Sequence, residues 1–91
     1  MNKLPYKLRI FEWAAVKNSP FTVEDIMKAL KPEYGTEKQF TLKRTEEYVQ
    51  SLLGACMINA VETDLDENDE LQVVYQVTDF GFSRMKHIPN H

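Results

Sequence analysis

Residues 58–77 read INAVETDLDENDELQVVYQV, and they contain two runs rich in β-branched and aromatic residues on either side of an acidic segment. In the second run two sets of side chains alternate, namely Leu71, Val73, Tyr75 and Val77 with Gln72, Val74 and Gln76. Alternation with a period of two places the two sets on opposite faces of a strand. The pattern therefore predicts two antiparallel strands, over 58–65 and 71–78, joined by a turn.

The hairpin tip, 64–70, is dominated by carboxylates: Asp64, Asp66, Glu67, Asp69 and Glu70. Because five carboxylates cannot be buried without partners, we expect the hairpin tip to be solvated. Asp64, Asp66 and Asn68 fall at the first, third and fifth positions of a calcium-binding EF-hand loop. That loop needs a glycine next and a glutamate at its end, where this chain has Asp69 and Tyr75. We interpret the match as chance and expect no metal here.

The residues before the hairpin, 42–56, show helical periodicity. Their apolar stripe consists of Leu42, Thr45, Val49, Leu52, Leu53 and Cys56. Recurrence every three or four residues places these side chains on one face, which we expect to be anchored in the core. Thr41 is the predicted N-cap, and Cys56 is interpreted as a small buried hydrophobe rather than a redox switch. The opposite face carries Lys43, Arg44, Glu47, Gln50 and Ser51.

Two further helices are predicted towards the N-terminus. The first, over 6–18, has an apolar pattern covering more than half of its surface, so it should contact both the core and a second surface, either a partner subunit or the C-terminal helix. The second is capped by Thr22 and ended by Pro32. Its expected buried stripe is Ile26, Met27, Ala29 and Leu30. In the connector that follows, Thr36 and Gln39 match a capping box.

After the hairpin, the sequence predicts a short C-terminal helix. Thr78 or Asp79 would cap it, and Pro89 would end it. Its inward-facing residues are expected to be Phe82, Met85 and Ile88. His87 has no candidate catalytic partner in the sequence, and no nucleophile elbow or phosphate-binding glycine loop is present. We therefore expect no enzymatic activity.

The composition indicates one domain over residues 1–91. With one cysteine and two histidines, neither a disulfide nor a structural metal is expected, and no cofactor is predicted. No segment has the length of a membrane span, so we expect a soluble cytoplasmic protein. The net charge is −3, but residues 1–50 carry nine Lys/Arg against seven Asp/Glu, a net of +2. A local basic patch is therefore compatible with the acidic total.

The order helix, helix, helix, strand, strand, helix resembles a winged helix-turn-helix domain. RTEEYVQSLLGACMI, residues 44–58, resembles the recognition helix of bacterial winged-helix regulators running into the first wing strand. VYQVTDFGFSRM, residues 74–85, is similar to the Y-x-L-T-x-x-G phrase that closes the wing in PadR-like and MarR-like repressors. The resemblance implies an α+β fold with a three-helix core, a two-stranded β-hairpin wing and a short C-terminal helix.

The resemblance also implies a function, in which residues 41–50 enter the DNA major groove with Ile26 and Leu30 supporting them from behind. The DNA-binding candidates are Lys38, Gln39, Thr41, Lys43, Arg44, Glu47 and Gln50. The chain departs from the family pattern in three places: Cys56 replaces the glycine that usually ends the recognition helix, the connector before that helix is long, and the wing tip is acidic where DNA-contacting wings carry Lys or Arg.

Two functions follow as hypotheses. The first is a small transcriptional regulator that binds double-stranded DNA as a homodimer, with dimer contacts from the helix over 6–18 and the C-terminal helix. The alternative is a protein-interaction module that engages a basic partner with the acidic tip 64–70 and does not bind DNA. Without the resemblance, Lys43, Arg44 and Gln50 would be interpreted as ordinary solvated residues.

Overall fold

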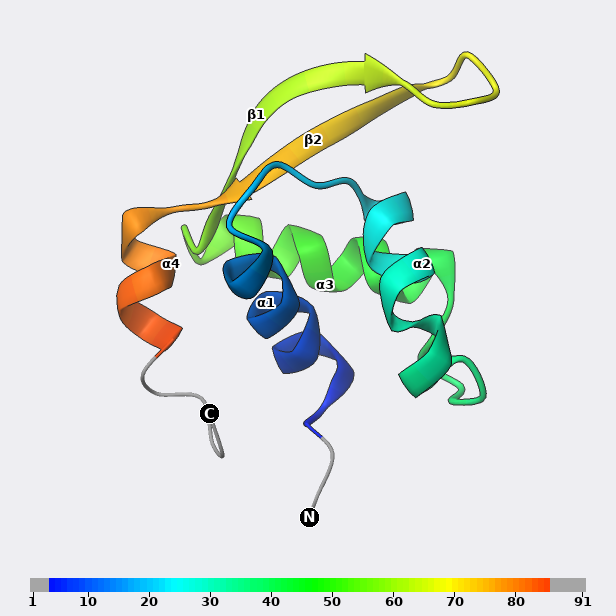
Figure 1. The fold of residues 1–91 in the computed structure, drawn as a ribbon, viewed down its shortest axis with the longest axis horizontal. Coiled ribbons are helices and arrows are strands. Elements are labelled where there is room, and N and C mark those ends of the chain that lie inside the picture. The colour runs from blue at the N-terminus through cyan, green and yellow to red at the C-terminus, as the bar shows by residue number, and fades with distance from the viewer. Residues whose placement is uncertain (1–3, 86–91) are drawn as a thin grey trace.

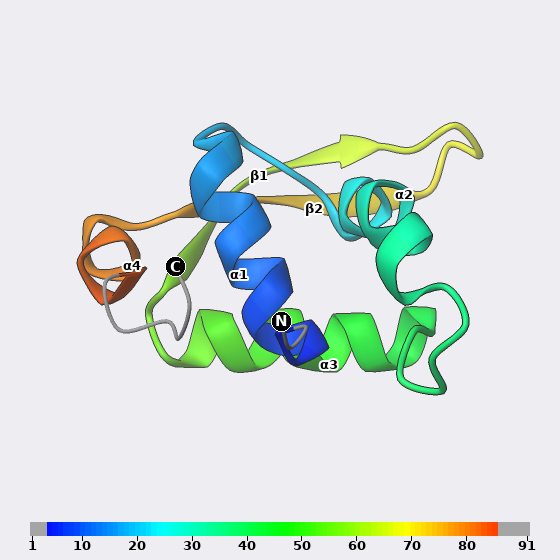
Figure 2. The ribbon, with the colours of Figure 1, turned by 60° about the horizontal axis from the view of Figure 1, so that its bottom comes forward.

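The computed structural model describes residues 4–85 (Figure 1). Its elements, in chain order, are α1 (Tyr6–Lys17), α2 (Val23–Tyr34), α3 (Leu42–Gly54), β1 (Ile58–Leu65), β2 (Leu71–Val77) and α4 (Asp79–Arg84). The predicted α+β order is confirmed. The three longer helices lie on one side of the hairpin, and α1 crosses α3 (Figure 2).

The core forms where α1, α2, α3 and the base of the hairpin meet. Its fully buried side chains include Ile10 of α1, Ile26 and Leu30 of α2, and Val49 of α3. In β1 only Ile58 is buried, whereas Val74, Tyr75 and Val77 of β2 are buried. The distal half of the hairpin therefore extends beyond the core, as Figure 1 shows.

The hairpin is antiparallel, with Ile58 opposite Val77 and Leu65 opposite Leu71, and it has a bulge between Ala60 and Glu62. At the tip, Asp66 Oδ1 accepts hydrogen bonds from the backbone N–H groups of Asn68 (2.8 Å) and Glu70 (3.0 Å). The predicted acidic turn is confirmed. Because Asp66 accepts hydrogen bonds from two backbone N–H groups of its own turn, it stabilises the tip.

A short backbone bridge that the sequence did not predict joins the α1–α2 connection to the hairpin. Phe21 N–H donates to the Tyr75 carbonyl (2.9 Å), and Tyr75 N–H donates to the Phe21 carbonyl (2.7 Å). The ring of Phe21 also packs edge-on against Trp13, with centroids 5.6 Å apart. These contacts attach β2 to the helical part of the molecule.

Helix α2 begins where the sequence predicts and ends later. Thr22 and Asp25 form a reciprocal capping box at its start. The prediction that Pro32 ends the helix is wrong, because α2 continues to Tyr34. Proline removes one helical hydrogen bond, but the last turn gains contacts elsewhere: Tyr34 is fully buried and its hydroxyl donates to the Leu4 carbonyl.

Two side-chain expectations around α2 also fail. Ala29 is exposed and Met27 only half-buried, so the buried stripe is narrower than predicted. Met27 lines an open groove, described below, rather than the core, whereas Ala29 is exposed and does not line that groove. In the connector, Thr36 makes no capping hydrogen bond, and residues 35–40 form turns closed by Glu37 N–H to Tyr34 and Phe40 N–H to Glu37.

Helix α3 is capped by Thr41, as predicted, and ends at Gly54, two residues before the predicted end. Cys56 adopts a left-handed conformation (φ 64°), while Cys56 N–H and Met57 N–H donate to the carbonyls of Leu53 and Leu52, each at 3.0 Å. This is the Schellman geometry that glycine usually supplies. The departure at Cys56 therefore leaves the exit geometry intact, but Cys56 is exposed, contrary to the prediction that it is buried.

Helix α4 is held against the hairpin base by a close backbone approach at Gly81. Thr78 caps α4, accepting from Gly81 N–H (2.8 Å) and donating to the Cys56 carbonyl (2.7 Å). A Cβ atom on Gly81 would lie 2.2 Å from the Met57 carbonyl oxygen, so only glycine fits. Phe82 packs on the core, as does Met85. The predictions for His87, Ile88 and Pro89 lie outside the described residues.

Candidate nucleic-acid interface

An aromatic cluster anchors the N-terminal half of α3. The ring of Tyr6 packs against Tyr34, Phe40 and Tyr48, at centroid distances of 5.1, 5.6 and 5.9 Å. Thr45 Oγ1 lies 2.8 Å from the Tyr6 hydroxyl and donates to the Thr41 carbonyl at 2.7 Å. Because the single proton of Thr45 is used, Tyr6 is the donor to Thr45. Burial raises the pKa of Tyr6.

The solvent face of α3 carries four of the seven predicted DNA-binding residues. Helical geometry places Lys43, Glu47 and Gln50 opposite the buried side chains of Thr45 and Val49. Arg44 is also exposed, and its Nη1 lies 3.2 Å from Glu47 Oε1. Within residues 4–85, Lys43 makes no ion pair. The structure therefore brings Lys43, Arg44, Glu47 and Gln50 together on one exposed surface.

The other three candidates lie at or before the start of α3. Lys38 is exposed on the connector. Gln39 is half-buried, where its amide donates to Glu37 Oε1 (2.8 Å) and accepts from the Tyr48 hydroxyl (3.2 Å). The Thr41 hydroxyl accepts from Arg44 N–H (3.1 Å). Gln39 and Thr41 are thus already engaged in closing the connector and capping the helix.

Lys7 of α1 belongs to the same surface, although it was not among the predicted DNA-binding residues. Its Nζ donates to Ser51 Oγ of α3 at 2.6 Å, and both side chains are at the surface. Arg44 and Ser51 are seven residues apart, two helical turns, so they share one edge of α3. The only signal in the sequence was the basic character of the N-terminal half. We call Lys7, Arg44 and Ser51 the α1 edge.

The opposite edge of α3 faces the hairpin and is chemically different. Leu42 is 57% exposed there, so the prediction that Leu42 is anchored in the core is wrong. Glu46 and Gln50 follow Leu42 along this edge, and Gln50 Nε2 lies 3.4 Å from the Tyr75 hydroxyl of β2, a weak contact. We call Leu42, Glu46 and Gln50 the hairpin edge.

The hairpin tip lies over α2 and carries no positive charge. Lys28 of α2 has a raised pKa, chiefly because it pairs with Glu24 at 3.0 Å, and the carboxylate of Glu67 at the tip contributes. Residues 64–70 contain no Lys or Arg. A phosphate backbone approaching between the tip and α3 would therefore meet carboxylates.

Residues 4–85 contain neither a group of metal ligands nor a helix that could span a membrane. No three His, Cys, Asp or Glu side chains in that range are grouped to hold a metal ion. None of the helices found in that range is long and apolar enough to cross a membrane.

No protein-family model matches the sequence, and no curated protein sequence matches it. Solved structures do match. TA0346 from Thermoplasma acidophilum, a proposed transcriptional regulator, aligns with a TM-score of 0.70 at 15% identity, over 90% of this chain and 74% of that one. Bacillus subtilis PadR, solved in complex with operator DNA, aligns with a TM-score of 0.67 at 16% identity. The fold is a winged helix.

The PadR alignment covers 92% of this chain and 51% of PadR, so the winged-helix domain described here corresponds to about half of that protein. A third match is HOP2, whose structure concerns DNA recognition and protein interaction domains. It aligns with a TM-score of 0.58 at 15% identity, over 81% of this chain and all of that one. At these identities the matches establish the shared winged-helix fold, with the hairpin as the wing.

Proposed function

We propose that this winged-helix domain binds double-stranded DNA and acts as a transcriptional regulator, with α3 entering the major groove. One observation carries the proposal: Lys43, Arg44 and Gln50 project from the solvent face of a helix whose opposite face is fixed to the core. Lys7 extends the cationic surface along the α1 edge. PadR, a structural neighbour, was solved with operator DNA, which supports the same use of the fold here.

The side chains match the chemistry of base and phosphate recognition. Arg and Lys donate to guanine edges or phosphates, and Gln can pair with adenine. The Arg44–Glu47 pair does not prevent this, because both side chains are about half exposed (54% and 48%). Such exposed pairs contribute at most about 1 kcal/mol. Arg44 can therefore exchange Glu47 for a phosphate oxygen at little cost.

The proposed docking geometry avoids the acidic wing tip. DNA would contact the solvent face of α3 and the α1 edge, while the tip stays over α2 on the opposite side. Each Lys or Arg that neutralises a phosphate adds roughly one unit to the slope of the logarithm of the binding constant against the logarithm of the salt concentration. Lys7, Lys43 and Arg44 are the cations we propose for this role, with Lys38 at the periphery.

We also propose that the full chain, residues 1–91, folds as one domain and forms a homodimer in the cytoplasm. Val16 of α1 and Phe80 of α4 are large apolar side chains left 72% and 51% exposed. Contacts through these two helices would present two α3 helices to a palindromic site. Sedimentation velocity of the wild type and of Val16→Ser/Phe80→Ser tests this, because the double substitution should shift a dimer towards monomer.

The test of DNA binding is a fluorescence anisotropy titration with a random-sequence duplex, at about 50 mM and about 200 mM salt. We expect binding that weakens steeply with salt and is lost in Lys43→Ala/Arg44→Ala. Lys28→Ala/Lys31→Ala is the matched control, since it removes two exposed lysines from α2. Equal losses in both variants would contradict the proposal, because the effect would then be one of net charge alone.

The alternative function, a protein-interaction module without DNA binding, is the outcome if no duplex binding is detected even at low salt. Retention on a heparin column does not separate the two functions, because any protein with a basic patch is retained on heparin. Chemical-shift mapping with duplex DNA decides which side of α3 is involved.

A further inference from the structure

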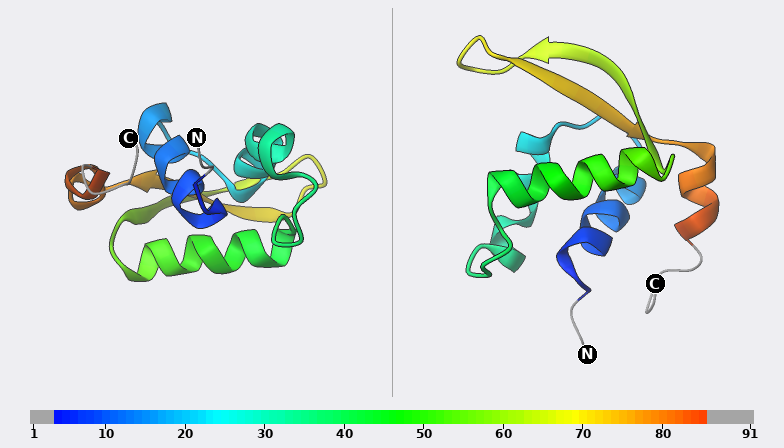
Figure 3. Two further views of the ribbon diagram at one scale, coloured as in Figure 1. Left: turned by 90° about the horizontal axis from the view of Figure 1, so that it is seen from below. Right: turned by 180° about the vertical axis from the view of Figure 1, so that it is seen from behind.

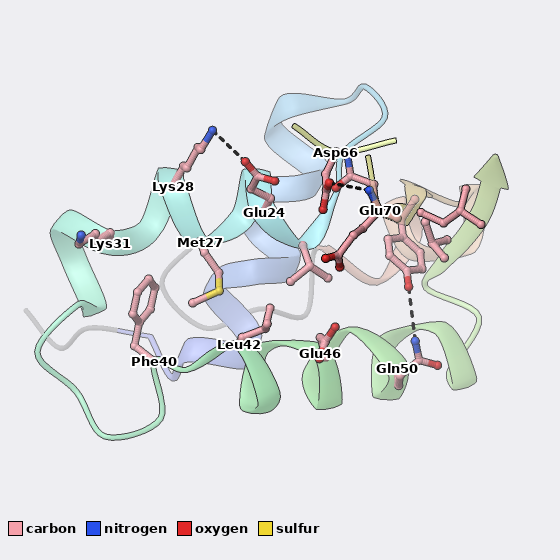
Figure 4. A pocket seen from close by; sticks show the side chains of 15 residues that line it. Glu24, Met27, Lys28, Lys31, Phe40, Leu42, Glu46, Gln50, Asp66 and Glu70 are labelled. Carbon is pink, nitrogen blue, oxygen red and sulfur yellow. Dashed lines mark hydrogen bonds and ion pairs between the residues drawn. The ribbon is translucent and has the colours of Figure 1, made fainter. Parts of the chain in front are cut away.

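A groove of about 900 Å³ lies between α2, α3 and the hairpin (Figure 4). Its apolar lining includes Val23, Met27, Phe40, Leu42, Leu71 and Val73. Three of these side chains are well exposed: Leu71 at 77%, Leu42 at 57% and Val73 at 37%. Contiguous exposed apolar surface on a soluble domain usually marks a binding site.

The groove is also negatively charged. Its lining contains four carboxylates, those of Glu24, Glu46, Asp66 and Glu70, against the two lysines Lys28 and Lys31, a net of −2. Glu24 pairs with Lys28, and Asp66 accepts backbone hydrogen bonds.

Two carboxylates of the groove lack a cationic partner. Within residues 4–85, neither Glu46 nor Glu70 forms an ion pair. Figure 4 shows Glu46 on α3 and Glu70 on the hairpin, on opposite walls. An occupant therefore meets a free negative charge on each side.

We propose that this groove binds a basic amphipathic helix of a partner protein. The apolar side chains of that helix would pack between Leu42 on one wall and Leu71 and Val73 on the other. Its flanking Lys or Arg residues would pair with Glu46 and Glu70. A helix that lays one apolar face into a groove is a recurrent mode of peptide recognition.

Charge and geometry favour a basic amphipathic helix over a nucleic acid or a small cation as the occupant of the groove. A nucleic acid would bring phosphates against the two free carboxylates and apolar surface. A small cation could neutralise one wall but leave the other unpaired. A helix with basic residues on both sides of an apolar stripe satisfies both walls at once. The groove shares Gln50 with the solvent face of α3, but its two charged walls lie on the hairpin side, away from the α1 edge, so the groove does not depend on DNA binding.

The test uses the full chain and a fluorescein-labelled synthetic peptide of about 15 residues, long enough to form a helix. The peptide has Leu at i, i+4 and i+7 with Lys on both flanks, and a scrambled peptide of the same composition is the control. We expect the patterned peptide to bind more tightly than the scrambled one. Amide chemical-shift changes should concentrate at Leu42, Glu46 and residues 70–73.

Two variants probe the apolar and charged parts separately. Leu42→Ser/Leu71→Ser should weaken peptide binding about tenfold or more while leaving the melting temperature nearly unchanged, because both side chains are exposed in the free protein. Val61→Ser, at a residue 48% exposed on β1 that does not line the groove, is the matched control and should have no effect.

The charge-swap experiment is the sharper one. Glu46→Lys/Glu70→Lys should reject the Lys-flanked peptide and accept a peptide with the same Leu stripe and Glu on the flanks. Glu62→Lys, which changes a carboxylate that does not line the groove, should keep the original preference.

Four outcomes would overturn the proposal. The scrambled peptide could bind equally well, or the charge swap could fail to reverse the preference. Dodecyltrimethylammonium could bind with the same shift pattern where the peptide does not, which would make the occupant a small amphiphile. Sedimentation could show that Leu42→Ser/Leu71→Ser disrupts a dimer, which would make it a second copy of this chain. Loss of DNA binding in the Lys43→Ala/Arg44→Ala variant would affect none of these results.

Discussion

The two edges of α3 differ in chemistry although they belong to one helix. The α1 edge carries Arg44 and Ser51, with Lys7 reaching across from α1. The hairpin edge carries Leu42 and Glu46 and opens onto the groove. Figure 3 (right) shows α3 running between the hairpin on one side and the N-terminal end of α1 on the other. The element packed beside each edge of α3 therefore decides what that edge can bind.

The largest effect expected is from Gly81→Ala, which disturbs the base of the hairpin and so the wall of the groove. A Cβ atom at this position would lie 2.2 Å from the Met57 carbonyl oxygen, so the backbone must move. We expect a loss of about 3 kcal/mol in the free energy of unfolding, measured by urea denaturation.

Gly54→Ala is the control for that substitution, because nothing lies within 4 Å of a Cβ atom built on Gly54. It should stabilise the protein by about 0.5 kcal/mol, since alanine is the better helix former. If Gly81→Ala were as well tolerated as Gly54→Ala, the hairpin would not be fixed by that close approach.

Thr45→Val should have the next largest effect, because it breaks the link that holds α1 against α3. Valine has a similar shape but cannot accept the hydrogen bond from Tyr6, whose hydroxyl would be left buried and unsatisfied. We expect a loss of about 2 kcal/mol in the free energy of unfolding. Tyr6→Phe in the Thr45→Val background should recover part of the loss, and a purely additive double variant would show that the two side chains are not coupled.

Alkaline pH should destabilise the protein through three buried tyrosines, which lie on α1, α2 and β2. Burial raises the pKa of Tyr6, Tyr34 and Tyr75 above the ordinary value of 10.0. Well below pH 10 these tyrosines are protonated in both the folded and the unfolded state, so they do not make stability depend on pH. As pH rises above about 10 the unfolded state loses protons first, and stability falls by up to about 1.4 kcal/mol per pH unit for each such tyrosine.

Circular dichroism with denaturant at a series of pH values measures this loss, and absorbance near the phenolate band follows the ionisation itself. Tyr6→Phe should show a shallower decline above pH 10 than the wild type. An equal slope in the two proteins would mean that Tyr6 does not titrate differently in the folded and unfolded states.

The smallest effect is expected from Glu46→Gln, which neutralises a carboxylate beside the solvent face of α3. If DNA docks on α3, removing this repulsion should tighten duplex binding about two- to threefold at low salt, with less effect at high salt. Glu62→Gln removes the same charge from β1 and is the control. A larger effect from Glu62 would indicate that DNA approaches the hairpin rather than the α1 edge.

Local interactions explain which parts of this protein could be predicted from its sequence. The N-caps Thr22 and Thr41 lie where they were predicted, Thr78 is one of the two predicted caps of α4, and the acidic turn at 66–70 falls within the predicted segment 64–70. Each depends on residues within about four positions along the chain, and so does the periodicity that distinguishes the helices from the strands. The order of elements, and with it the winged-helix fold, could therefore be inferred before any contact was known.

The remaining features depend on segments that are distant in sequence. Burial of Tyr34 extends α2 past Pro32, and the hairpin's position leaves Leu42 at the side of a groove. Lys7 and Ser51 are 44 residues apart and meet only after α1 has packed on α3. Periodicity in the sequence predicts which face of a helix is buried and which is exposed. What the exposed face can bind also depends on the elements that pack beside it. For α3 those elements are α1 and the hairpin, and tertiary packing alone placed them there.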